Sequence, residues 1–178
     1  MEILNYDKFT KFTKLIIIGM PGAGKTTIMN KLIKKGYCSI DIDRLIEPNR
    51  ITFSQLAKTN EFKDKEHDAF KLGCLSSVFN IISTGGSVPC DVRNRLLLKD
   101  EKNLVIWLDL DSDILEKRMG GIAGALERGV CFNNKTETIK EIYKKRYKYY
   151  KKCADVKITN IELKNTMKII NRLLVFMN

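Results

Sequence analysis

The sequence predicts an α/β fold in which a parallel β-sheet is covered by helices on both faces. Short apolar runs bounded by turns recur along the chain, as is typical of buried parallel strands. Segments with helical periodicity separate these runs, and this alternation indicates βαβ units. A length of 178 residues fits one domain, so we expect a single domain over residues 1–178.

Five segments are predicted to be strands. The apolar runs are Leu15 to Ile18, Ser39 to Ile42, Asn80 to Ser83 and Leu104 to Leu108, with a weaker run at Val156 to Ile158. The carboxyl ends of parallel strands meet at one edge of a sheet, and ligands bind there. The polar residues that follow each run are therefore the first candidates for a functional site.

Helices are predicted between and after these runs. Their expected ranges are Lys25 to Lys35 with Gly36 as the stop, about Glu66 to Phe79, Asp91 to Leu98, Ser112 to Met119, Thr136 to Lys152, and Leu163 to Phe176. We expect the chain to fray before Thr13 and after Met177. Two regions, Glu47 to Asp64 and Gly120 to Lys135, have neither a strand nor a helix pattern. The second contains four glycines, which lower the cost of backbone rearrangement, so we expect a mobile flap there.

Composition narrows the class of protein. The five cysteines are scattered without C-x-x-C spacing and the chain has one histidine, His67, so neither a zinc site nor a disulfide framework is indicated. This cysteine usage favours a reducing, cytoplasmic compartment. No basic leader with an apolar core begins the chain, and no apolar stretch approaches the ~20 residues that span a bilayer, so we expect no membrane partner.

The net charge of +11 raises the question of nucleic-acid binding. The lysines are spread along the whole chain, in pairs such as Lys34-Lys35, Lys144-Lys145 and Lys151-Lys152, rather than gathered in one tract. This spread favours a lysine-rich solvated surface over a nucleic-acid site. We expect a monomer that binds small molecules.

Residues 19–26 read Gly-Met-Pro-Gly-Ala-Gly-Lys-Thr, between a predicted strand and a predicted helix. This is the G-x-x-x-x-G-K-[ST] phosphate-binding loop in its required setting, although a glycine-rich turn can spell the motif by chance. Its backbone N–H groups turn inward on a polyphosphate, Lys25 supplies charge to the β and γ phosphates, and Thr26 joins the shell of Mg²⁺. The loop predicts binding of a nucleoside triphosphate, with the expected contacts in Gly22, Ala23, Gly24, Lys25, Thr26 and Thr27.

Asp41 and Asp43 follow the second predicted strand. Period-2 strand geometry directs both side chains the same way, so one carboxylate can serve a metal shell while the other reaches a substrate hydroxyl. The competing interpretation is a strand end followed by an Asp cap on the next helix. The phosphate loop upstream favours a catalytic role for the pair.

Thr84-Gly85-Gly86-Ser87 ends the third predicted strand. Bare backbone at Gly85 and Gly86 allows a small polar ligand to approach and meet N–H donors. A plain turn is the alternative interpretation of these two glycines.

Five segments taken together resemble, in order, the landmarks of shikimate kinases. They are G-M-P-G-A-G-K-T, D-I-D-R-L-I-E, T-G-G-S, V-I-W-L-D followed by Arg118, and R-Y-K-Y-Y-K-K-C-A-D. The resemblance runs from about Lys14 to Thr159. It implies a three-layer α/β/α P-loop NTPase fold with a five-stranded parallel sheet of order 2-3-1-4-5. It further implies a substrate-binding region at 47–64, a mobile lid at 119–135, and transfer of the γ-phosphoryl group of ATP to the 3-hydroxyl of shikimate with Mg²⁺.

The resemblance also assigns roles to single residues. Asp43 matches the residue that contacts the acceptor hydroxyls and acts as a base, and Asp41 matches the carboxylate that holds Mg²⁺ through water. The acceptor lies against Gly85 and Gly86 and its carboxylate meets the guanidinium of Arg146, a planar fork suited to two oxygens. Arg118 flanks the adenine, unless it is only an i,i+4 partner on an exposed helix. Arg128 is the lid arginine that stabilises the γ-phosphate in the transition state, so Lys25, Asp43 and Arg128 form the expected catalytic set.

Departures from the family pattern concern the acceptor. We align the family's Phe-Arg-x-x-Glu signature with Phe70-Lys71-Leu72-Gly73-Cys74, which makes Lys71 the expected substrate cation and removes the acid. Ser87 replaces a third glycine, and Arg128-Gly129-Val130 replaces Arg-Pro-Leu-Leu. Shikimate is the expected acceptor of the kinase. The alternatives are another small acceptor, such as a polyol acid or a nucleoside monophosphate, and a non-catalytic nucleotide-binding regulator.

Overall fold

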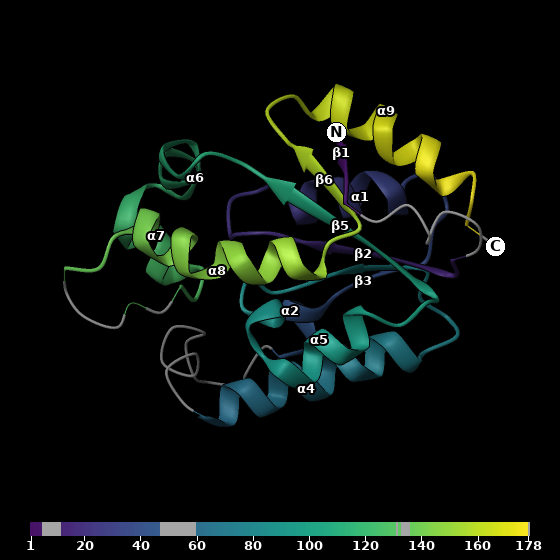
Figure 1. Cartoon of the computed structure of the whole chain (residues 1–178), viewed down its shortest axis with the longest axis horizontal. Coiled ribbons are helices and arrows are strands. Elements are labelled where there is room, and N and C mark those ends of the chain that lie inside the picture. The colour runs from purple at the N-terminus through teal and green to yellow at the C-terminus, as the bar shows by residue number, and fades with distance from the viewer. Residues whose placement is uncertain (5–11, 47–59, 131, 133–135, 178) are drawn as a thin grey trace.

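The computed structural model describes residues 1–4, 12–46, 60–130, 132 and 136–177. Its core is one six-stranded sheet in the order β1-β6-β5-β2-β4-β3, drawn in Figure 1. The strands are β1 (Glu2–Ile3), β2 (Lys14–Ile18), β3 (Ser39–Asp41), β4 (Ile81–Ser83), β5 (Asn103–Asp109) and β6 (Val156–Thr159). Strands β2 to β6 pair in parallel, which confirms the predicted parallel sheet of order 2-3-1-4-5.

The sixth strand, β1, corrects the expectation that the chain frays before Thr13. Glu2 and Ile3 pair antiparallel with Lys157 and Val156 at the edge of β6. A two-residue strand carries too little periodicity to be seen in the sequence, and the unpaired edge of β6 provides the hydrogen bonds that hold it.

The helices follow the predicted alternation. They are α1 (Lys25–Ile33), α2 (Ile42–Leu45), α4 (Asn60–Leu75), α5 (Val92–Leu98), α6 (Ser112–Met119), α7 (Gly121–Glu127), α8 (Ile139–Cys153) and α9 (Leu163–Leu174), with a 3₁₀ turn η2 (Val88–Cys90). Figure 1 shows α1 and α9 on the opposite side of the sheet from α4 and α5. A hydrogen bond of 2.8 Å between Lys35 Nζ and Asn171 Oδ1 links the α1 and α9 regions.

Two helix predictions need correction. Helix α4 begins at Asn60, six residues before the expected start, and it ends at Leu75 rather than Phe79. The glycine-rich region after Met119 contains α7, although no helix was expected there. Gly120 and Gly121 have φ values of 83° and 75°, so the chain breaks between α6 and α7 before helical geometry resumes. Motion of this region stays a prediction.

Aromatic packing fixes α8 against the sheet. Trp107 of β5 is buried, with Tyr147 edge-on at 5.1 Å and Tyr150 stacked at 5.6 Å between ring centroids. A capping box at Thr138 and Glu141 begins the helix. These contacts place one face of α8 over the carboxyl edge of the sheet. In the described part of the chain, no helix is both long and apolar enough to cross a bilayer.

Candidate active site

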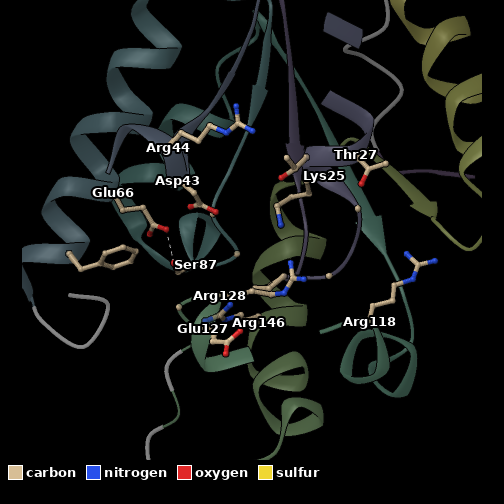
Figure 2. A pocket seen from close by; sticks show the side chains of 18 residues that line it. Lys25, Thr27, Asp43, Arg44, Glu66, Ser87, Arg118, Glu127, Arg128 and Arg146 are labelled. Atoms are coloured by element: carbon tan, nitrogen blue, oxygen red, sulfur yellow. Dashed lines mark hydrogen bonds between the residues drawn. The ribbon is translucent and has the colours of Figure 1, made fainter. Parts of the chain in front are cut away.

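The site is a cavity of about 770 Å³ at the carboxyl edge of the sheet, shown in Figure 2. It brings together residues from the phosphate loop, α2, α4, the turn after β4, α6, α7 and α8. The sequence-predicted residues that line it are Gly22, Gly24, Lys25, Thr26, Thr27, Asp43, Gly85, Gly86, Arg118, Arg128 and Arg146. These eleven predicted residues, which are spread along the chain from Gly22 to Arg146, therefore surround one space.

Lys25 lies at the centre of this cavity (Figure 2). Its side chain is buried and donates to the carbonyl oxygens of Gly19 at 2.9 Å and Met20 at 3.1 Å. Burial lowers the pKa of Lys25 below its ordinary value, while the carboxyl groups of Asp43 and Asp41 oppose the shift. The ammonium group is therefore held in place by the loop, at the point where a polyphosphate would meet it.

Thr26 and Asp41 meet beside Lys25. The Thr26 hydroxyl donates to Asp41 Oδ2 at 3.0 Å, and Asp41 itself is buried at the end of β3. A hydroxyl and a carboxylate at this point fit the preference of Mg²⁺ for oxygen ligands at a few protein groups plus substrate phosphates. The predicted metal residues are thus adjacent and of suitable chemistry.

The strand geometry expected for Asp41 and Asp43 needs correction. Strand β3 ends at Asp41, and Asp41 Oδ1 accepts from the backbone N–H of Asp43 at 3.3 Å, so Asp41 is the N-cap of α2. Asp43 is therefore a helical residue and not the next outward position of a strand. The capping alternative holds for Asp41, and the cap is also what turns Asp43 into the cavity.

Asp43 and Glu66 form a close carboxyl pair over Gly85 (Figure 2). A Cβ atom at Gly85 would lie 2.6 Å from Glu66 Oε1 and 2.7 Å from Asp43 Oδ1, so any larger residue there would displace the two carboxyl groups. Among the described residues, Asp43 Oδ1 is buried without a hydrogen-bond partner. Glu66 Oε1 accepts from the Ser87 hydroxyl at 2.6 Å. An orphaned carboxyl oxygen in a cavity is suited to a ligand hydroxyl.

Both carboxyl groups have raised pKa values. Burial raises the pKa of Asp43 to about 6, against the lowering effect of Lys25. Burial also raises the pKa of Glu66 to about 7, against the hydrogen bond from Ser87. Carboxyl groups with pKa values near neutrality, in a cavity, are typical of groups that exchange protons.

Arg146 enters the cavity from α8. A Cβ atom at Gly86 would lie 3.0 Å from Arg146 Nη1 and 2.7 Å from Pro21 Cδ, so glycine lets α8, the turn after β4 and the phosphate loop meet. The Tyr150 hydroxyl donates to the Gly86 carbonyl at 2.6 Å and fixes this turn against α8. Arg146 is thus placed beside the carboxyl pair.

Arg118 and Arg128 also line the cavity (Figure 2). Arg118 Nη2 donates to the backbone carbonyls of Asn160 at 3.4 Å and Ile161 at 3.2 Å, so it contacts the loop after β6 rather than an i,i+4 partner. Arg128 is exposed at the end of α7. The positive charges of Arg128 and Arg146 both act on Lys25, which indicates that three cations converge on one region.

Comparison with known proteins identifies the family. The model of the family described as shikimate kinase matches residues 21–178. The chain belongs to the shikimate kinase family. It is 30% identical over 151 residues to the shikimate kinase of Macrococcus caseolyticus, covering 82% of this chain and 86% of that protein. It is 35% identical over 148 residues to the shikimate kinase of Streptococcus gordonii, covering 78% and 85%.

Solved structures agree on the fold. Shikimate kinase from Acinetobacter baumannii in complex with shikimate superposes with a TM-score of 0.75 at 19% identity, covering 94% of this chain and 95% of that one. Shikimate kinase from Bacteroides thetaiotaomicron gives a TM-score of 0.70 at 21% identity, covering 92% and 98%. The predicted P-loop kinase fold is confirmed. As a shikimate kinase family member, the chain is an ATP- and Mg²⁺-dependent phosphotransferase that acts on a hydroxyl group.

Three predicted residues do not line the cavity. Ala23 and Asp41 lie directly behind the lining, in the phosphate loop and under Thr26. The prediction that Lys71 binds the substrate needs correction. Its side chain is exposed on α4 and lines neither this cavity nor the adjoining one. Helix geometry explains this placement, because Lys71 is five residues, or about 140° of rotation, beyond Glu66.

The structure instead brings Phe62 and Glu66 to the cavity, and sequence reasoning missed both. They belong to the segment Phe62-Lys63-Asp64-Lys65-Glu66, which has the spacing of the family signature Phe-Arg-x-x-Glu. The alignment on Phe70 therefore used the wrong turn of the helix, and the acid assumed to be missing is present. The signal was available, but the expected helix start at Glu66 left Phe62 outside the helix. Residues 47–59 of the expected substrate-binding region lie outside the described residues.

Proposed function

We propose that this protein transfers the γ-phosphoryl group of ATP to the 3-hydroxyl of shikimate. The observation that carries the proposal is the cavity in which Lys25, the carboxyl pair Asp43 and Glu66, and Arg146 face one space. Shikimate presents hydroxyls and one carboxylate, and this cavity offers carboxyl oxygens to the former and a guanidinium to the latter. Membership of the shikimate kinase family supports the same substrate.

In this reaction the 3-hydroxyl oxygen attacks the γ-phosphorus and the bond to the bridging oxygen of ADP breaks. The hydroxyl proton passes to Asp43, whose pKa of about 6 leaves it ionised at neutral pH and able to accept a proton. Lys25 and the lid residue Arg128 stabilise negative charge on the transferring group. Thr26 and Asp41 would hold Mg²⁺, which neutralises phosphate charge when bound.

Acceptor recognition is assigned to the residues around Gly85 and Gly86. The acceptor ring lies over Gly85 and Gly86, and Arg146 contacts its carboxylate. Lys63 takes the position of the signature arginine in place of Lys71, since it lies one turn before Glu66 and lines the adjoining cavity with Arg146. An ammonium group is a point charge without the fork of arginine, so Arg146 carries the bidentate contact.

The test is ADP release from Mg·ATP with shikimate, beside a panel of other small hydroxy acids and nucleoside monophosphates. We expect turnover with shikimate and formation of a phosphate monoester, identified by phosphorus NMR. Turnover only with another acceptor would support the kinase activity and contradict shikimate as the substrate. ATP binding without turnover on any acceptor would favour the regulator.

The base role of Asp43 is tested with Asp43→Asn. The amide keeps the shape of the side chain but does not accept the hydroxyl proton, so we expect turnover to fall by at least about 100-fold. ADP affinity should stay within about threefold of wild type, as measured by calorimetry. Normal turnover in this variant would contradict the role of Asp43 as the base.

A further inference from the structure

Asn160 is a buried polar residue that directly contacts the phosphate loop from outside the cavity lining. It follows β6, and its side-chain amide donates to the Ala23 carbonyl at 2.6 Å. A Cβ atom at Gly24 would lie 2.6 Å from Asn160 Nδ2, so the amide also packs against Gly24. One side chain therefore supports the two residues that precede Lys25.

The hydrogen bond to Ala23 determines the direction of the next N–H group. In a trans peptide the carbonyl of one residue and the N–H of the following residue point in opposite directions. Because the described residues contain no cis peptide bond, fixing the Ala23 carbonyl on Asn160 directs the Gly24 N–H away from Asn160. Gly24 and Lys25 both line the cavity.

Thr166 holds the Asn160 amide in place. The Thr166 hydroxyl donates to Asn160 Oδ1 at 2.7 Å, and both side chains are buried. With its oxygen held by Thr166, the amide presents its NH₂ group to Ala23. A flipped amide would set Asn160 Oδ1 against the Ala23 carbonyl oxygen, so that carbonyl selects the orientation and the Thr166 hydroxyl in α9 holds it by donating to Oδ1.

Asn160 also connects the loop with Arg118. The backbone carbonyls of Asn160 and Ile161 accept from Arg118 Nη2, and the Asn160 N–H donates to the Asp109 carbonyl at 2.9 Å. The same short segment is therefore tied to the phosphate loop on one side and to Arg118 on the other.

We propose that Asn160, held by Thr166, is a positioning residue for nucleotide binding that directs the Gly24 N–H toward the polyphosphate. The inference rests on the proposed function, which supplies the nucleotide. Without this support the Ala23–Gly24 peptide is free to rotate, and the loop loses a donor that was fixed before the nucleotide arrived.

The experiment is calorimetric titration of ADP into Thr166→Val and Thr166→Ser. Valine has the shape of threonine without the hydroxyl, so Asn160 is no longer held. We expect the Kd for ADP to rise about tenfold, which corresponds to the loss of one hydrogen bond from the Gly24 N–H to the charged polyphosphate. Serine keeps the hydroxyl and should restore the wild-type Kd. Thr159→Val makes the same change at an exposed position and should leave the Kd unchanged.

A second pair of variants covers the case in which Thr166→Val does not fold. Asn160→Ser is too short to reach Ala23 and should raise the Kd for ADP at least as much, with the KM for the acceptor unchanged. The control is Asn165→Ala, whose amide bonds only to exposed Glu162 among the described residues. A variant with a lower melting temperature and wild-type ADP affinity would show a purely structural role and overturn the inference. Absence of ADP binding by the wild-type protein would overturn the proposed function as well.

Discussion

Single residues acquire unusual chemistry here because the fold buries them together. Glu66 and Asp43 come from different helices, yet both approach Gly85 and both have pKa values raised by burial. A Cβ on Gly85 would separate or displace them. In the sequence, Gly85 is one of two adjacent glycines in a turn. In the folded protein it provides the surface on which the two carboxyl groups meet.

The pKa of Asp43 predicts the acid limb of the pH profile. Asp43 serves as a base only when ionised, and its pKa is about 6. We expect kcat/KM for the acceptor to fall about tenfold for each pH unit well below 6 and to level off above it. The measurement is initial rate against pH at low acceptor concentration. A profile that stays flat down to pH 4.5 would contradict the raised pKa.

The pKa of Glu66 predicts a change in stability with pH. The folded protein holds a proton up to about pH 7 that an unfolded carboxyl releases near 4.5, so the free energy of unfolding falls as pH rises between these values. Glu66→Gln has no titrating group, so it removes this fall in stability, and its amide oxygen can still accept the hydrogen bond from the Ser87 hydroxyl. We expect the variant to be more stable than wild type at pH 8, by on the order of 1–3 kcal/mol, and equal to it near pH 4.5. Denaturant unfolding at both pH values measures this difference, and a gap independent of pH would refute the prediction.

At the scale of elements, the ends of helices bring the active groups into position. The N-cap at Asp41 turns the chain from β3 into α2 and so directs Asp43 into the cavity. Helix α8 carries Arg146 and is held by Trp107 and Tyr150. Helix α7 carries Arg128 at its end, after the two glycines with positive φ.

The position of Arg128 at the end of α7 predicts a variant with impaired turnover but intact binding. If Arg128 meets the γ-phosphate mainly in the transition state, Arg128→Ala should lower kcat by about 100-fold or more and change the Kd for ADP by less than about threefold. Steady-state kinetics and calorimetry separate the two effects. Lys117→Ala removes a like charge from the exposed face of α6 and serves as the control. Unchanged kcat in Arg128→Ala would remove Arg128 from the catalytic set.

At the scale of the whole molecule, the cavity is lined by many separate elements: the phosphate loop, the turn after β4 and the helices α1, α2, α4, α6, α7 and α8. A ligand that contacts all of them should stabilise the entire domain. Mg·ATP at 100 times its Kd adds about 2.7 kcal/mol to the free energy of unfolding. For a chain of this length the melting temperature should rise by about 5–10 °C. Differential scanning fluorimetry measures the shift. Lys25→Ala should lose most of it, and a full shift in this variant would place the nucleotide elsewhere.

The net charge of +11 also belongs to the whole molecule, and the structure relates part of it to the cavity. Lys25, Arg128 and Arg146 converge there, where a polyphosphate and a carboxylate would neutralise them. Many other lysines lie on exposed helix faces, as in Lys144, Lys148 and Lys151 of α8. This division agrees with the expectation of small anionic ligands.

Local patterns in the sequence determined much of this protein. The strand and helix alternation and the phosphate loop are each readable within a few residues, because period and turn chemistry are local properties. The Asp41–Asp43 segment was found in the same way, but its predicted strand geometry was wrong because Asp41 caps α2. The sheet order and the expected roles of Arg118, Arg128 and Arg146 came from resemblance to the family. Lys71 was misplaced because a shift in the assumed helix alignment rotates a side chain to another face.

Only the tertiary structure decided which distant groups touch. The meeting of Glu66 with Asp43 over Gly85, the bond from Ser87 to Glu66, and the support of the phosphate loop by Asn160 join residues from separate elements. No periodicity marks such pairs, because each partner satisfies the rules of its own helix or turn whether or not the other is present. Their burial, and with it the raised pKa of each carboxyl group, exists only once the layers have packed.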